Sequence, residues 1–306
     1  MPVPTLSLRD FTHGSPADKA AFSSALMGGL QDYGFIILAD HNVPTDLLDT
    51  AYAQAEQVFA LPQDQKRAHA AGLRGYTPFG TEHAKDSGLP DLKEFWQIGR
   101  EPAPGLPAQD FPPNVWPTEV DGFQATFSAL FAALDETGRL LLEALAPQLG
   151  LEPSYFDDKV AEGTSILRVL HYPPVPGDAP AGAVRSAPHE DINFITILVA
   201  ARGAGLQLLD RDGSWLPVET QPRNLIVDSG DMLQRLTNGV IPSTTHRVVN
   251  PVGPNVSRYS MPFFMHPTSA TSLKCLPTCK GEAEQWPEIT AGEFLSERLK
   301  EIGLVK

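Results

Sequence analysis

The chain has 306 residues, of which 42% are hydrophobic and 20% are charged, a balance that is typical of a globular protein and that excludes a disordered or fibrous chain. Its net charge of −14 at pH 7 disfavours binding to nucleic acid or to anionic membranes, and no cluster of lysines and arginines offsets this charge. The apolar runs are far shorter than the ~20 residues that a transmembrane helix needs, and the N-terminus shows no secretory signal pattern.

The two cysteines, Cys275 and Cys279, are too few for a disulfide framework. A lone C-x3-C pair without further soft ligands is also a poor zinc site. Reduced thiols of this kind are typical of an intracellular protein. The sequence therefore predicts a cytoplasmic protein with neither a nucleic acid nor a membrane as its partner.

The first part of the chain, up to about residue 150, is predicted to be mainly helical. Ser15 followed by Pro16 is typical of a helix start, and Gly34 is expected to end that helix. A short buried strand is expected over residues 35–38, and a second helix begins near Pro44. Together these segments predict helices that pack on at least one strand.

Three further segments of the chain have distinct patterns. Residues 72–118 are rich in Gly and Pro and are expected to be dominated by loops. Residues 121–149 show the clearest helical periodicity of the chain, with aromatic and leucine side chains on one face. The tail, residues 290–306, is expected to form a short amphipathic helix.

The sequence pattern changes from helical to β-rich over residues 164–268, where short β-rich runs alternate with turn signals such as Asn238-Gly239. The expected strands cover residues 166–172, 193–200, 205–209, 215–218, 225–227, 232–236, 246–249 and 258–265. Many short strands at this spacing predict a two-sheet sandwich or jelly roll. The expected fold class is therefore α+β, with a jelly-roll core flanked by helices from the N-terminal region.

A candidate metal site lies in this β-rich part. His189 is the histidine that has an aspartate two residues later, Asp191, and side chains at positions i and i+2 of a strand point to one side. His246, at the start of a later strand, is the best third ligand. Two histidines and one carboxylate are the arrangement of non-haem Fe(II) oxygenases. The alternative is that His189 lies on a surface turn and that His246 is an ordinary core histidine.

A candidate carboxylate site follows the metal motif. Arg258 and Ser260 share one face of a strand, and a guanidinium beside a hydroxyl binds a carboxylate well. Tyr172, on the strand that opens the β-rich part, is a third donor. The alternatives are a surface ion pair for Arg258 and an edge-strand position for Tyr172.

These residues carry a resemblance to a known family. The motifs in order are Tyr172-Pro-Pro174, His189-Glu-Asp191, Gly205-Leu-Gln207, Gly230-Asp-Met232, Asn238-Gly239, His246-Arg-Val248, Arg258-Tyr-Ser260 and Phe263-Phe264, preceded by Gly34-Phe-Ile36, Leu61-Pro62, Lys66 and Lys93-Glu94. The chain resembles the iron- and 2-oxoglutarate-dependent oxygenases of the isopenicillin N synthase-like superfamily. The resemblance covers about residues 3 to 270, and the set of motifs is highly specific in this order.

Carried over position by position, the resemblance implies a double-stranded β-helix that binds Fe(II) and 2-oxoglutarate. The implied iron ligands are His189, Asp191 and His246, and the implied contacts to the distal carboxylate of 2-oxoglutarate are Arg258, Ser260 and Tyr172. Two motifs depart from the family pattern. Before the Pro-Pro pair, Leu170 and His171 stand where the family often has asparagine and tyrosine, so a polar contact from the first position is lost. In the metal motif, Glu190 stands where the family often has a threonine; neither departure removes a metal ligand.

The resemblance also implies an activity. The expected reaction oxidises, by default hydroxylates, a C–H bond of a small organic molecule, with O2 and 2-oxoglutarate as co-substrates and succinate and CO2 as products. A related Fe(II) oxidase that does not use 2-oxoglutarate is one alternative. A metal-binding jelly roll without catalysis and a zinc hydrolase are others, but they leave the Arg258 clamp without a purpose.

The expected domain organisation is an N-terminal oxygenase region over 1–120, linking helices over 121–163, a jelly-roll core over 164–270 and a tail over 271–306. The substrate pocket is expected between the loop-rich N-terminal segment and the core. The candidate substrate residues are Tyr76, Phe79, Glu82, Phe95, Arg168 and Phe264. Each of these side chains has ordinary packing as its alternative.

Overall fold

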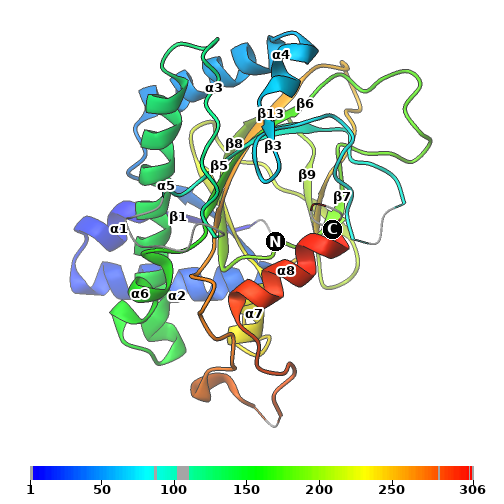
Figure 1. The fold of residues 1–306 in the computed structure, drawn as a ribbon. Helices are drawn as coiled ribbons and strands as arrows, with labels where there is room; N and C mark the ends of the chain where they lie inside the picture. Colours follow the sequence, from blue (N-terminus) through cyan, green and yellow to red (C-terminus); the bar gives the residue numbers. More distant parts are fainter. Residues whose placement is uncertain (1–2, 86–87, 102–109, 282, 303, 305–306) are drawn as a thin grey trace.

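The computed structural model of the protein describes residues 3–85, 88–101, 110–281, 283–302 and 304, and Figure 1 shows their arrangement. The α-helices are α1 (Leu8–His13), α2 (Pro16–Tyr33), α3 (Thr45–Ala60), α4 (Gln63–Ala68), α5 (Phe123–Leu145), α6 (Asp157–Val160), α7 (Asp231–Leu236) and α8 (Ala291–Glu301), and the short 3-10 helices are η1 (Ala146–Leu149), η2 (Pro153–Phe156) and η3 (Pro277–Cys279). The strands are β1 (Thr5–Ser7), β2 (Phe35–Ala39), β3 (Ala70–Ala71), β4 (Arg74–Thr77), β5 (Glu94–Gly99), β6 (Ile166–Tyr172), β7 (Ser186–His189), β8 (Ile195–Arg202), β9 (Leu206–Leu209), β10 (Trp215–Pro217), β11 (Leu225–Ser229), β12 (His246–Val248) and β13 (Arg258–Met265).

The strands of the described residues form two sheets. The large sheet has the order β1-β2-β11-β8-β13-β6-β5-β4-β3, and the small sheet has the order β10-β9-β12-β7. The pairing of β1 with β2 is parallel, whereas β8, β11 and β13 pair antiparallel in the centre of the large sheet. Strands from the first hundred residues thus extend the same sheet as strands of the β-rich part. The fold is α+β with the predicted jelly-roll core.

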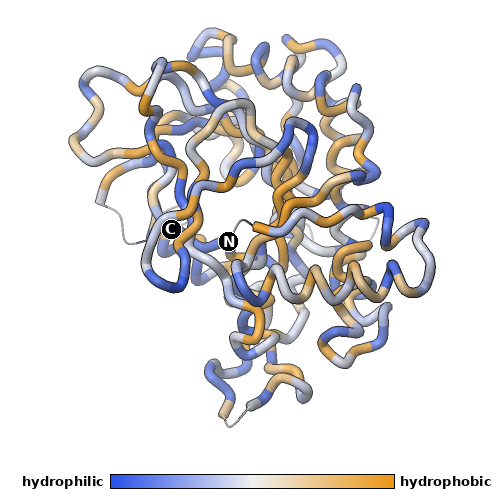
Figure 2. The backbone as a smooth tube through the Cα atoms, turned by 180° about the vertical axis from the view of Figure 1, so that it is seen from behind, coloured by the Kyte–Doolittle hydropathy of each residue, from blue (hydrophilic) through white to orange (hydrophobic). Residues whose placement is uncertain are grey.

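The large sheet separates two apolar cores, because successive side chains of a strand point to opposite faces. Figure 1 shows α2, α3 and α5 on one side of the strands and β7 and β9 on the other. Figure 2 shows the hydrophobic stretches gathered along the central strands. The core between the two sheets consists of Phe35, Phe95, Leu170, Tyr172, Leu198, Leu206, Leu208, Val218, Ile226 and Val248. The inner face of the large sheet therefore looks onto the small sheet.

The helix α2 begins and ends as the sequence predicts. The Ser15 side chain accepts from the Asp18 N–H while the Asp18 carboxylate accepts from the Ser15 N–H, and Pro16 is the first helical residue. Gly34 ends the helix with φ +66°, a left-handed conformation that favours glycine. The amphipathic tail helix is also confirmed as α8, which Thr290 caps; residues 303, 305 and 306 of the predicted tail lie outside the described residues.

The segment 72–118 contains more regular structure than expected. It holds β4 and β5, which join the large sheet beside β6. The prediction of a loop was wrong there because both strands are buried on both faces and so lack the alternation that marks a half-exposed strand. The part over 102–109 lies outside the described residues.

Two short elements near the metal motif also differ from expectation. The predicted strand over 232–236 is wrong, since these residues belong to α7, where Met232, Leu233 and Leu236 are buried at helical spacing. The strand β7 was not among the predicted strands. It contains the exposed Pro188, which is tolerated because β7 is the edge of the small sheet.

Among the described residues, no helix is both long and apolar enough to cross a membrane.

Candidate active site

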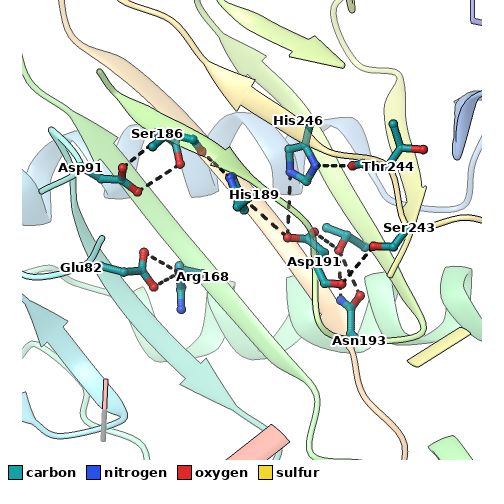
Figure 3. Close-up of polar contacts among 12 residues, drawn as sticks. Glu82, Asp91, Arg168, Ser186, His189, Asp191, Asn193, Ser243, Thr244 and His246 are labelled. Atoms are coloured by element: carbon teal, nitrogen blue, oxygen red, sulfur yellow. Dashed lines mark hydrogen bonds and ion pairs between the residues drawn. The ribbon is translucent and has the colours of Figure 1, made fainter. Parts of the chain in front are cut away.

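The three predicted metal ligands converge at the edge of the small sheet, as Figure 3 shows. His189 ends β7 and His246 begins β12, and the two residues are direct partners in the antiparallel pairing. The Oδ1 atom of Asp191 lies 3.9 Å from the Nε2 atom of each histidine. All three ligand atoms lie within 4.8 Å of one another, so that one ion can be bound between them.

Backbone carbonyls orient both imidazoles. The Nδ1 atom of His189 lies 2.8 Å from the Ala187 carbonyl, and the Nδ1 atom of His246 lies 3.1 Å from the Thr244 carbonyl. A carbonyl only accepts, so Nδ1 carries the proton and donates it. This leaves the lone pair of Nε2 facing Asp191 in both histidines, the form in which imidazole binds a metal.

A hydroxyl orients the carboxylate ligand. The Thr196 hydroxyl donates to the Oδ2 atom of Asp191, and the Asn193 side-chain amide donates to the Thr196 oxygen at 3.0 Å. Burial alone would raise the pKa of Asp191, but the two histidines and the Thr196 hydroxyl hold it below its usual value. Asp191 is therefore ionised, as a metal ligand must be, with Oδ1 left for the ion.

The surroundings also keep the buried histidine neutral. Burial and the neighbouring His189 lower the pKa of His246 to about 4. The Phe35 ring meets the His246 ring edge-on at 5.5 Å between centroids. Burial and the charge of Asp191 raise the pKa of Asp228, on β11, well above its usual value. Asp191 is therefore the negative charge that this cluster offers to a cation.

The predicted carboxylate site lies on the inner face of the large sheet. Arg258 is 1% exposed, and its Nε and Nη1 atoms have no hydrogen-bond partner in the described part of the chain. Its Cζ atom lies 5.0 Å from the centroid of the Tyr172 ring, directly across the β13–β6 pairing. Ser260 is two residues further on the same face and is 2% exposed. A buried guanidinium with unused donors fits the distal carboxylate of 2-oxoglutarate.

Comparisons with known proteins agree with this geometry. Residues 3–119 match the family "non-haem dioxygenase in morphine synthesis N-terminal", and residues 163–267 match the 2OG-Fe(II) oxygenase superfamily. The 2-oxoglutarate-Fe(II) type oxidoreductase hxnY of Emericella nidulans is 32% identical, over 95% of this chain and 88% of the relative. The chain belongs to the 2OG-Fe(II) oxygenase superfamily.

Two solved structures share the whole fold of this oxygenase. A 2OG-Fe(II) oxygenase family protein from Caulobacter crescentus is 43% identical with a TM-score of 0.87, covering 97% of this chain and 98% of that one. A Neurospora crassa protein in complex with alpha-KG and thymine is 30% identical with a TM-score of 0.87, covering 97% of this chain and 96% of that one. The protein is an Fe(II)- and 2-oxoglutarate-dependent dioxygenase, and O2 is its other co-substrate.

Four of the six predicted substrate residues of the oxygenase lie together. The Arg168 guanidinium contacts the Glu82 carboxylate at 3.0 Å and the Gln97 side-chain oxygen at 2.9 Å. Its Cζ atom lies 4.2 Å from the centroid of the Phe95 ring and 5.4 Å from that of Phe264. Figure 3 shows Arg168 and Glu82 in the same region as the triad, and the charge of Arg168 helps to lower the pKa of Asp191.

The other two predicted substrate residues have different surroundings. The Tyr76 hydroxyl donates to the buried Glu94 carboxylate, and the Tyr76 ring belongs to the core between sheet and helices. Phe79 is 37% exposed on the loop after β4. His171, which departs from the family pattern, also faces the helices: its Nδ1 atom lies 2.7 Å from Glu94, and its ring stacks on Tyr259.

A buried ion network links the substrate residues to a metal ligand, and the sequence did not reveal it. The Lys93 ammonium lies 2.7 Å from the Glu82 carboxylate and 2.8 Å from the Asp91 carboxylate. Asp91 also accepts from the Ala187 N–H at 2.9 Å, and the Ala187 carbonyl orients His189. The sequence marked Lys93 only as part of the motif Lys93-Glu94, and it did not mark Asp91 or reveal the network, because the partners come from distant segments of the chain.

The side chains of the network stabilise one another in their charged forms. Burial alone would raise the pKa of Glu82, but Arg168 and Lys93 lower it to about 2. Burial alone would lower the pKa of Lys93, but Glu82 and Asp91 raise it above its usual value. Glu82 and Lys93 are therefore both charged at neutral pH.

Proposed function

We propose that this oxygenase hydroxylates a C–H bond of a small, polar, uncharged molecule. The proposed iron ligands are His189, Asp191 and His246, and the proposed 2-oxoglutarate contacts are Arg258, Ser260 and Tyr172. The observation that carries the proposal is the convergence of three ligand atoms within 4.8 Å, combined with a buried guanidinium whose Nε and Nη1 atoms lack a hydrogen-bond partner in the described part of the chain.

Each proposed residue has a separate task. The two histidines and Asp191 would hold the ion through Nε2, Nε2 and Oδ1. The bound iron supplies the activation of O2, which is coupled to the conversion of 2-oxoglutarate to succinate and CO2. Arg258 binds the far end of 2-oxoglutarate with two parallel donors, and Ser260 adds a hydroxyl donor beside it. The protein thereby fixes both ends of the co-substrate.

The charges beside the triad favour an uncharged substrate. The cations Arg168 and Lys93 already pair with the carboxylates of Glu82 and Asp91. A substrate carboxylate would need to break one of these buried pairs, which is costly. The rings of Phe95 and Phe264 beside these paired charges suit a molecule with apolar faces and polar edges. The similar Neurospora crassa protein, whose complex contains the uncharged molecule thymine, supports this choice.

The same proposal includes the cytoplasm as the compartment. Cys275 and Cys279 are both free thiols and both buried. The net charge of −14 supports a partner that is a small molecule instead of a nucleic acid or an anionic membrane.

The ligand assignment is tested by metal content. After anaerobic loading with Fe(II), His189→Ala, Asp191→Ala and His246→Ala should each retain little iron and lose the visible charge-transfer band that Fe(II) and 2-oxoglutarate give together. Glu190→Gln is the matched control, because Glu190 is exposed and bonds only the Thr245 hydroxyl among its described contacts. Wild-type iron content in a ligand variant removes that residue from the site, and loading with zinc instead of iron gives no band.

The substrate class is tested by succinate formation. The iron-loaded enzyme is offered uncharged amides and heterocycles beside carboxylic acids of similar size. Turnover of carboxylic acids alone would contradict the proposal. Glu82→Gln should release the charge of Arg168 and shift the preference toward carboxylic acids.

A further inference from the structure

Two arginines are buried on the inner side of the fold, and one of them donates to a backbone carbonyl two residues before the other. Arg185, which directly precedes β7, is 3% exposed, and Arg258, at the start of β13, is 1% exposed. The Nε atom of each has no hydrogen-bond partner, and neither guanidinium forms an ion pair with any described residue. The two cations therefore lack a counter-charge in the described part of the chain.

Several contacts place Arg185 close to Arg258. The Nη2 atom of Arg185 donates to the Val256 carbonyl, only two residues before Arg258. Burial and the charge of Arg258 both lower the pKa of Arg185, whereas Tyr172 raises it. The Tyr172 ring is the surface on which the Arg258 guanidinium lies. Both arginines therefore lie near Tyr172 on the inner side of the fold.

An acidic side chain beside this segment is already engaged. Asp91 accepts from the hydroxyl of Ser186, the residue after Arg185, and from the Ala187 N–H, and it pairs with Lys93. Two like charges that are removed from water without an anion raise the free energy of the folded protein. An anion that enters between the arginines would remove this cost, and a carboxylate has one oxygen for each guanidinium.

We propose that Arg185 is a second binding residue for the distal carboxylate of 2-oxoglutarate, which it holds together with Arg258. This inference rests on the proposed placement of the co-substrate at Arg258. It predicts that Arg185 selects 2-oxo acids with two carboxylates over those with one. The matched ligand is 2-oxopentanoate, which has the same carbon chain but a methyl group in place of the distal carboxylate.

The test measures binding in the absence of O2. Fe(II)-loaded wild type and Arg185→Met are titrated with 2-oxoglutarate and with 2-oxopentanoate, and the visible charge-transfer band reports binding. Loss of a hydrogen bond to a charged group should raise the Kd for 2-oxoglutarate about 10- to 150-fold. The Kd for 2-oxopentanoate should change by less than about 3-fold, because that ligand never reaches Arg185.

Two further variants distinguish loss of the Arg185 charge from disruption of the fold. Arg185→Gln keeps an N–H donor for the Val256 carbonyl but carries no charge, and it should lose 2-oxoglutarate affinity as Arg185→Met does. Arg74→Met is the control for a buried arginine elsewhere, since Arg74 is 4% exposed with an unpartnered Nε atom on β4. It should bind 2-oxoglutarate as the wild type does.

Three outcomes overturn the inference or its basis. Wild-type affinity for 2-oxoglutarate in Arg185→Gln would show that the charge of Arg185 is not used. An equal loss of both ligands in Arg185→Met and Arg185→Gln would show that Arg185 only maintains the fold. If Arg258→Met also binds 2-oxoglutarate normally, the proposed co-substrate site itself is wrong.

Discussion

At the scale of single residues, the metal centre depends on one pairing between strands. His189 and His246 lie directly opposite each other, and His246 also pairs with Leu208 of β9. A shift of β12 by one residue would turn the imidazole of His246 to the other face of the small sheet. The geometry of the site therefore depends on the register of three short strands, β7, β9 and β12.

The first prediction concerns the co-substrate arginine. Arg258→Lys should raise the KM for 2-oxoglutarate about 10- to 150-fold, because lysine offers a point charge instead of the planar pair of donors that matches a carboxylate. Iron affinity should remain near that of the wild type, since Arg258 contacts no metal ligand in the described structure. Steady-state kinetics with varied 2-oxoglutarate, together with iron content, measure both quantities. An unchanged KM would place the distal carboxylate elsewhere.

The second prediction compares two phenylalanines that the sequence placed in the same pocket. Phe95 is 1% exposed and supports the Arg168 guanidinium, whereas Phe79 is 37% exposed. Phe95→Ala should lower the amount of product formed per succinate, because Arg168 and the substrate lose their positions; Phe79→Ala should leave this ratio near the wild-type value. The amounts of product and of succinate are measured for both variants with a known substrate, alongside the melting temperature.

The alternative for Phe95 is that its ring only fills space between the sheets. In that case Phe95→Ala loses about 3–5 kcal/mol of stability but keeps its product per succinate. Such a result would remove Phe95 from the substrate site.

The sequence predicted the candidate metal ligands but not the residues that orient them. His189, Asp191 and His246 follow a spacing that chemistry requires, so a linear pattern marks them. Thr196 and Asp91 act through contacts that only the folded sheets create. Threonine and aspartate are common in every protein, and nothing in the neighbouring residues sets these two apart.

At the scale of elements, the clearest predictions came from long periodic segments and the wrong ones from short segments. The helices α2 and α5 repeat their apolar spacing over several turns, so their patterns are unambiguous. The pattern of the five residues 232–236 fits a strand and a helical turn equally well. In the structure these residues form a helix, α7, with Met232, Leu233 and Leu236 buried on one side. The strand β7 carries a proline and was not recognised, although it ends at a metal ligand.

The third prediction concerns the junction between α2 and the metal site. A Cβ atom on Gly34 would lie 2.1 Å from the Thr244 hydroxyl, and Gly34 has φ +66°. Gly34→Ala should therefore cost at least about 1–2 kcal/mol in the free energy of unfolding and should lower iron affinity, because Thr244 orients His246. Denaturant unfolding and iron titration measure the two effects.

The control is a glycine in the same helix. A Cβ atom on Gly28 would meet nothing within 4 Å, so Gly28→Ala should stabilise the protein by about 0.5–1 kcal/mol without any effect on iron. Equal iron affinity in both variants would show that the end of α2 does not position the metal site.

At the scale of the whole molecule, the two faces of the large sheet have different roles. The outer face packs on the helices and holds the network of Glu94 and His171. The inner face holds Arg258, Arg168 and the core between the sheets. The jelly-roll class was predictable, because many short strands separated by turn signals indicate it and the order of the motifs resembles that of a known family. The joining of β1 to β5 onto the same sheet was not, since the pairing of distant strands leaves no local pattern.

The fourth prediction concerns the stability of the metal-free protein in acid. His266, just after β13, is 7% exposed and its Nδ1 atom has no hydrogen-bond partner in the described part of the chain. Burial lowers its pKa to about 4, whereas a histidine in the unfolded chain titrates near about 6.5. Between these values the unfolded chain binds a proton that the folded protein excludes. The free energy of unfolding therefore falls as the pH drops through this window.

Other groups titrate in the same range, so the test compares two proteins. His246 acts in the same direction as His266, and Asp231, whose pKa burial raises to about 6, acts in the opposite direction. His266→Leu removes one titration and leaves these others in place. On lowering the pH from about 7 to about 5, the wild type should lose about 2 kcal/mol more stability than His266→Leu. Urea unfolding at both pH values measures the difference. An identical pH dependence in the two proteins would mean that His266 is protonated as readily in the folded protein as in the unfolded chain.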